Sequence, residues 1–168
     1  KKKSQSALNK QLLASVQQCN VRKVERLLKE GAEVHTTGQL AKATLLGYAA
    51  ADNSVEILKV LVAAGADLEG PTPHGASALH AAAFGGSPDA AKWLLEQGID
   101  WRRSAEGCTA LAQARNTPPP YARPRSWSQQ GQDAVAELLE AWEAAHADLP
   151  NENPTASNNS PFDQRYSA

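Results

Sequence analysis

The stretch Gly75–Trp101, GASALHAAAFGGSPDAAKWLLEQGIDW, decides the fold. It predicts a turn, a short Ala-rich helix, a break at Gly85-Gly86, a second apolar helix and a stop at Gly98. Much of the remaining chain looks like copies or modifications of this unit. The test is therefore whether the unit recurs at a fixed period of about 33 residues.

The unit does recur. The segments that end the second helix are LLKEGAEV, LVAAGADL and LLEQGIDW, so their glycines fall at positions 31, 65 and 98. These positions are 34 and 33 residues apart (65 − 31 and 98 − 65). The first helix recurs as well, as Thr44–Ala50 before the quoted stretch and as Gly107–Ala114 after it. A fourth copy of the second helix, Asp133–Leu139, begins 44 residues after Asp89, so about 12 residues are inserted (44 − 32).

This pattern resembles the ankyrin repeat, whose consensus runs G-x-T-P-L-H-x-A-A-x-x-G-H-x-x-V-V-x-L-L-L-x-x-G-A-D-V. The matching or conservatively replaced positions are Gly75, Ser77, Ala78, Leu79, His80, Ala82, Ala83, Gly86, Leu94, Leu95, Gly98 and Asp100. The resemblance implies an all-α solenoid of helix–turn–helix repeats joined by finger loops. It also implies that His80 is a structural histidine. Gly47 occupies the corresponding position of repeat two, which puts the finger-to-helix hydrogen bond of that repeat in doubt.

We expect a basic lead-in over residues 1–5, an ankyrin-like domain over 6–147 and an extended or disordered tail over 148–168. The predicted repeats cover residues 6–35, 36–70, 71–103 and 104–147, and the insertion covers 116–131. The first and last repeats are expected to be caps, with the closing helix running from Gln132 to about His146. Because the two helices of a repeat are antiparallel, the insertion should project from the edge opposite the fingers.

Net charge is −1 but is unevenly distributed. Residues 1–31 carry +6 (8 − 2), 32–100 carry −5 (3 − 8), 101–131 carry +4 (5 − 1) and 132–168 carry −6 (1 − 7). An acidic centre between basic regions is able to steer a charged partner, although ordinary solvated helix faces give the same layout. The chain as a whole is too near neutral to favour nucleic-acid binding, even though Arg115, Arg123 and Arg125 accompany two aromatic residues.

Other features exclude several classes of protein. Cys19 and Cys108 have neither a disulfide framework nor metal-ligand spacing, and the four histidines are dispersed. The sequence contains no nucleophile elbow, phosphate loop, nucleotide fingerprint, signal-peptide core or membrane-length apolar run. We therefore expect a non-enzymatic protein without cofactor or metal, monomeric and intracellular, with the cytoplasm favoured over the nucleus. The absence of methionine suggests a piece of a longer protein.

Ankyrin-like proteins bind partner proteins or peptides in a concave groove lined by fingers and first helices. Carried over by motif position, the groove would have Phe84 at its centre, either as a central anchor or merely as cover for the adjacent helix. The candidate partner-binding residues are Leu40, Tyr48, Asp52, Pro73, His74, Phe84, Trp101, Arg102, Arg103, Glu106 and Tyr121. The corresponding function is that of an adaptor or scaffold.

Two alternatives remain open. The insertion contains Pro118-Pro119-Pro120-Tyr121, which satisfies the P-P-x-Y pattern bound by WW domains. The simpler interpretation is a stiff loop whose Tyr121 and Trp127 pack on the helices. The other alternative is that the repeats pack on another domain of the parent chain, as a spacer or as a regulatory cover.

Overall fold

The computed structural model describes residues 4–35, 44–70, 75–116, 118, 121, 123–125 and 127–148. The expected tail, most of the fingers around Leu40 and Pro73, and the lead-in residues 1–3 lie outside this part. The described elements, in chain order, are α1 (Gln5–Gln17), α2 (Val21–Lys29), α3 (Leu45–Ala51), α4 (Val55–Ala63), α5 (Ala78–Gly85), α6 (Pro88–Glu96), β1 (Ser104–Ala105), β2 (Cys108–Thr109), α7 (Ala110–Ala114) and α8 (Gln129–Ala145).

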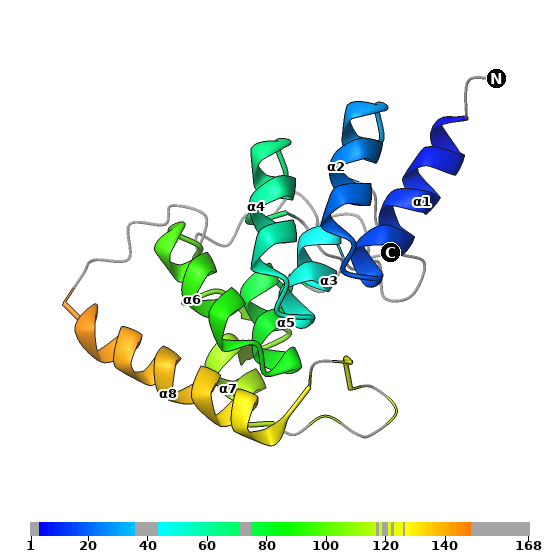
Figure 1. Cartoon of the computed structure of the whole chain (residues 1–168). Coiled ribbons are helices and arrows are strands. Elements are labelled where there is room, and N and C mark those ends of the chain that lie inside the picture. Colours follow the sequence, from blue (N-terminus) through cyan, green and yellow to red (C-terminus); the bar gives the residue numbers. More distant parts are fainter. Residues whose placement is uncertain are drawn as a thin grey trace, which may run out of the picture.

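The helices form four antiparallel pairs that stack side by side, as Figure 1 shows. The first helices α1, α3, α5 and α7 contact one another in sequence, and so do the second helices α2, α4, α6 and α8. The result is a two-layered, all-α solenoid, as the resemblance to the ankyrin repeat implied. Each pair is too small to bury its apolar face alone, so the neighbouring pairs complete its core.

The helix ends are fixed by the residues that the sequence pattern singled out. Gly31, Gly65 and Gly98 follow α2, α4 and α6 with φ of +94°, +91° and +81°, a left-handed conformation that glycine adopts without steric cost. At the start of α3, the Thr44 hydroxyl accepts a hydrogen bond from the backbone N–H of Gly47 at 3.1 Å. Although repeat two lacks the usual histidine, its first helix therefore retains a side-chain cap.

One apolar core runs through all four pairs. Leucines from both layers contribute to it, and Ala49 and Ala50 of α3 and Ala82 and Ala83 of α5 are fully buried in it. Gly85 lies against the backbone of Ala51, where a Cβ would come within 2.8 Å of the Ala51 Cα. The small residues thus permit the close approach of successive first helices.

Polar side chains reinforce the stack at the edge where the two helices of a pair meet. Asn53 accepts a hydrogen bond from the Ala90 backbone N–H at 2.9 Å and donates to the Asp89 carboxylate at 3.0 Å. The Ser87 hydroxyl donates to the Ala51 carbonyl at 2.9 Å. Repeats two and three are therefore joined by hydrogen bonds as well as by apolar packing.

The closing helix α8 begins at Gln129, three residues before the expected start at Gln132 (132 − 129). The cause is Ser128, whose hydroxyl accepts from the Gly131 backbone N–H at 2.9 Å and caps the helix. Gln132 is fully buried, and its side-chain amide donates to the Asn116 carbonyl at 3.1 Å. This hydrogen bond joins the beginning of α8 to the end of α7, so the two ends of the insertion lie close together.

Candidate protein-binding surface

A hollow of about 560 Å³ lies on the first-helix layer, between α3, α5 and the inserted segment. Small residues of the two helices supply part of its lining, and Tyr48 and Phe84 supply larger apolar surfaces. The lining residues are Gln17, Gly47, Tyr48, Ala51, Asp52, Ala81, Phe84, Arg123, Pro124 and Arg125. Three predicted site residues, Tyr48, Asp52 and Phe84, therefore come together in one place.

Asp52 is the acidic group of this hollow. Burial raises the pKa of its carboxyl above 3.8, while the charge of Arg125 and a hydrogen bond from the Arg125 backbone N–H oppose that rise. The carboxylate is thus a partly desolvated anion held beside a cation from the insertion. Such a group interacts more strongly with a cationic or N–H donor than an exposed carboxylate does.

The insertion does not simply project from the edge of the stack, because Arg123, Pro124 and Arg125 line the same hollow as α3 and α5. Described residues of the insertion also contact one another. The Arg123 guanidinium stacks 3.8 Å from the centroid of the Trp127 ring, and its Nε donates to the Pro118 carbonyl at 3.1 Å. The expectation of a projecting loop is corrected for these three residues: the chain turns back over the first helices.

Tyr121 departs from the simpler interpretation of the loop, since its side chain is 92% exposed. Trp127, in contrast, is half-buried. The expectation that both aromatic residues pack on the helices is therefore wrong for Tyr121. An almost fully exposed tyrosine beside prolines is accessible to a partner.

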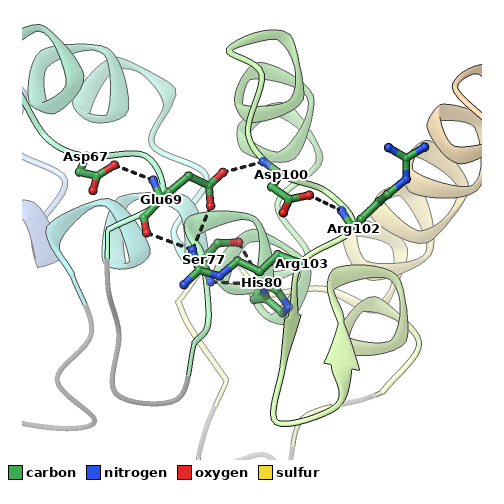
Figure 2. Close-up of polar contacts among 7 residues, drawn as sticks. All are labelled: Asp67, Glu69, Ser77, His80, Asp100, Arg102 and Arg103. Carbon is green, nitrogen blue, oxygen red and sulfur yellow. Dashed lines mark hydrogen bonds and ion pairs between the residues drawn. The ribbon is translucent and has the colours of Figure 1, made fainter. Parts of the chain in front are cut away.

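The finger region is held by a polar network (Figure 2). The Glu69 carboxylate accepts from the Asp100 backbone N–H at 2.6 Å and pairs with the Arg103 guanidinium at 3.0 Å. Arg103 also donates to the Glu69 carbonyl at 3.0 Å, and Asp100 accepts from the Arg102 backbone N–H at 3.1 Å. Arg103, a predicted partner-binding residue, is therefore engaged in joining the ends of repeats two and three.

Trp101 and Arg102 lie near α8, away from the hollow around Phe84. The Arg102 guanidinium sits 4.2 Å from the centroid of the Trp101 ring, and it donates to the His146 carbonyl at 3.1 Å. His146 in turn stacks on Trp142 with 4.4 Å between ring centroids. These contacts hold the end of α8 against the loop that follows α6. Trp101 and Arg102 therefore stabilise the packing of the last repeat.

Glu106 is at the tip of a short hairpin. Strands β1 and β2 pair antiparallel, with Ser104 opposite Thr109 and Ala105 opposite Cys108. Glu106 and Gly107 have φ of +50° and +78°, as a two-residue type I′ turn requires. Glu106 is exposed there, at the finger and not in the hollow.

His80 connects repeat three to repeat four. Its Nε2 lies 3.0 Å from the Cys108 carbonyl and must donate, because a carbonyl only accepts. Its Nδ1 then accepts from the Ser77 backbone N–H at 3.2 Å. The side chain is 5% exposed, and burial lowers its pKa below 6.5, opposed by the hydrogen bond to Cys108. The neutral imidazole with a proton on Nε2 satisfies both contacts.

We expect His80 to make the fold less stable in mild acid. Because its pKa is lower in the folded state, the unfolded chain binds more protons between that pKa and 6.5, so stability falls as pH drops through this window. Chemical denaturation at pH 7 and pH 5 measures the free energy of unfolding. His80→Gln should reduce stability at pH 7 and weaken the pH dependence; an unchanged dependence would contradict this role.

The predicted site residues thus separate into groups. Tyr48, Asp52 and Phe84 line the hollow; Trp101, Arg102, Arg103 and Glu106 belong to the finger region; Tyr121 is on the exposed loop. Leu40, Pro73 and His74 lie outside the described residues. The prediction missed Arg123, Pro124 and Arg125 as part of the surface, since nothing in the sequence says where an insertion folds back.

Comparison with protein families agrees with this architecture. A model of ankyrin repeats, in three copies, matches residues 12–105, more than half of the chain. The chain therefore belongs to the ankyrin-repeat family, whose members bind other proteins and are generally not enzymes. No curated protein matches the chain.

The described residues include neither a membrane-length apolar helix nor a metal-binding cluster. None of their helices is long and apolar enough to cross a membrane. Within the same ranges, no group of three His, Cys, Asp or Glu side chains is placed to hold a metal ion.

Proposed function

We propose that this chain is a protein-binding module, an adaptor or scaffold element, that recognises its partner on the first-helix layer around Phe84. The observation that carries the proposal is the hollow in which Tyr48, Asp52 and Phe84 from successive repeats converge. Small residues at Gly47, Ala51 and Ala81 allow a partner backbone to approach closely. We further propose that the module acts inside the cell as a monomer.

The mixture of groups in the hollow suits recognition of a peptide or loop. Half-buried aromatic side chains provide apolar contact area, and interface energy is typically concentrated in a few such central residues. Asp52 adds a charged acceptor in a partly desolvated position. Together they favour a partner segment that combines apolar surface with N–H donors or positive charge.

The test compares Phe84→Ala with Lys59→Ala in capture of partners from cell extract. Lys59 is an exposed residue of α4 and does not line the hollow, so its variant controls for surface change alone. A partner retained by wild type and Lys59→Ala but lost from Phe84→Ala supports the proposal. Equal capture by all three would contradict it, once matching circular dichroism shows that each variant is folded.

A second candidate function rests on the 92% exposure of Tyr121. It offers Pro118–Tyr121 to a WW-type domain, whose aromatic groove docks proline-rich segments. Tyr121→Ala in the same capture experiment separates the two candidates, because Tyr121 does not line the hollow. A partner lost only with this variant would assign binding to the insertion. A partner lost with neither variant would favour packing against another domain of the parent chain.

A further inference from the structure

The inserted segment covers part of the surface to which the proposed function assigns partner binding. Arg123, Pro124 and Arg125 line the same hollow as Tyr48 and Phe84, although Arg123 comes 39 positions after Phe84 in the chain (123 − 84). The insertion leaves the stack after α7 and returns at the start of α8. Its residues 123–125 lie beside α5 and α3.

The position of this segment is fixed from both sides. On the helix side, Asp52 accepts a hydrogen bond from the backbone N–H of Arg125 and lies near its positive charge. Within the loop, the Arg123 guanidinium covers the Trp127 ring and donates to the Pro118 carbonyl. These contacts hold an arginine, a proline and a second arginine together against the first helices.

The base of the insertion also has little freedom. Gly131, in the first turn of α8, meets the backbone of Gly86, where a Cβ on Gly131 would come within 3.1 Å of the Gly86 carbonyl carbon. Ser128 caps α8, and Gln132 is bonded to Asn116. Both ends of the loop are therefore anchored to the stack, which raises the effective concentration of the segment at the first-helix surface.

Charge complementarity supports the same arrangement. Among the residues that line the hollow, Asp52 is acidic, and Arg123 and Arg125 are cationic. A cationic segment therefore complements the charge that α3 and the residue after it present there. Proline adds a side chain that needs no hydrogen-bond partner and a backbone that loses little freedom on binding.

We propose that Arg123-Pro124-Arg125 is an internal ligand of the first-helix surface beside the hollow, held at Asp52, and that a partner takes its place there with an extended segment of the same chemistry, an arginine beside a proline. The inference rests on the proposed function, because it names the class of peptide that the surface binds. It also makes the insertion a competitor that the partner must displace. A tethered competitor reduces the observed affinity of the partner in proportion to the fraction of time that the site is free.

The experiment uses a labelled peptide with the sequence of residues 121–127, YARPRSW, and measures its binding by fluorescence anisotropy. The proteins are the wild-type chain and a variant in which residues 121–125 are replaced by five Gly and Ser residues. The replacement keeps the loop length and the Ser128 cap. We expect the peptide to bind the replaced variant at least about tenfold more tightly than wild type. Tyr121→Ala, outside the hollow, is the matched control and should bind as wild type does.

Two further changes test the chemistry. Adding Asp52→Asn to the replaced variant should weaken peptide binding, and so should replacing both peptide arginines with glutamate. If the replaced variant does not fold, Arg125→Glu in the intact loop tests the same point, because repulsion from Asp52 should release the segment and strengthen peptide binding. Circular dichroism checks the fold of each protein.

Equal peptide affinity for the wild-type and replaced proteins, or no binding to either, would overturn the inference. Binding that ignores both Asp52→Asn and the glutamate peptide would also overturn it. The proposed function is judged separately by the loss of captured partner with Phe84→Ala. If that loss occurs while the peptide experiment fails, the hollow binds its partner without an internal competitor.

Discussion

Gly85→Ala should destabilise the protein severely, although it adds only one methyl group. The new Cβ would lie 2.8 Å from the Ala51 Cα and closer still to the Ala51 carbonyl oxygen. Both atoms belong to the backbone of the neighbouring first helix, so no side-chain rotation relieves the clash. We expect the free energy of unfolding to fall by about 3 kcal/mol, and the melting temperature to fall by about 10 °C.

Gly47→Ala provides the matched control. Gly47 lies within α3, and its Cβ would meet the Thr44 Oγ1 at 3.5 Å and the Ala81 Cβ at 3.9 Å, which are ordinary contacts. Alanine in a helix interior is favoured over glycine by about 0.5–1 kcal/mol. Thermal and chemical denaturation should therefore show opposite signs for the two substitutions. A loss at Gly85 no larger than about 0.5 kcal/mol would show that α3 and α5 do not approach this closely.

Leu79→Ala is the second substitution with a large expected effect. Leu79 is 0% exposed in α5, which contacts α3, α6, α7 and α8. Replacing its isobutyl side chain with a methyl group leaves a cavity in the packed core, which the surrounding structure fills only in part. The expected loss is about 3–4 kcal/mol, measured by urea denaturation.

Leu28→Ala is the comparison for this substitution. Leu28 is half-buried in the first pair, at the end of α2, so part of its surface already meets water. Its loss should be about 1 kcal/mol. Equal losses at Leu28 and Leu79 would contradict a core that is completed by neighbouring pairs, because central and terminal positions would then be equivalent.

The fold could be predicted because its determinants are local and repeated. The glycines at 31, 65 and 98 end the second helices, and the Ala- and Leu-rich segments between them form the expected pairs. The role of His80 was also visible, since its position in the repeat matches a structural histidine. Its bond to the Cys108 carbonyl belongs to the contact between two repeats and could be described only from the structure.

The candidate site was less predictable, because its geometry depends on an irregular segment. The residues predicted to bind a partner included Tyr48, Asp52 and Phe84, which line one hollow. They also included Arg102 and Arg103, whose guanidinium groups are used for contacts within the fold. The repeat pattern stops at the insertion, so it carried no information on where Arg123 to Arg125 lie. Their position depends on contacts with Asp52 and Trp127 that have no periodic signature.

The start of α8 is a second feature that the repeat pattern could not predict. Repeat spacing placed the helix start at Gln132, whereas the Ser128 hydroxyl caps it so that it begins at Gln129. The capping serine lies within the irregular insertion, where the repeat offers no reference position. Serine is a common residue in loops as well as at caps, so the residue type alone does not decide between them.

The central claim is that partner recognition takes place on the first-helix layer around Phe84. The most direct measurement is the dissociation constant of a captured partner for purified wild type, Phe84→Ala and Lys59→Ala. The account predicts that Phe84→Ala weakens binding by at least about tenfold, as expected for a central interface residue, while Lys59→Ala leaves it unchanged. Identical affinities for wild type and Phe84→Ala would contradict the account and move recognition to another surface of the repeats or to the insertion.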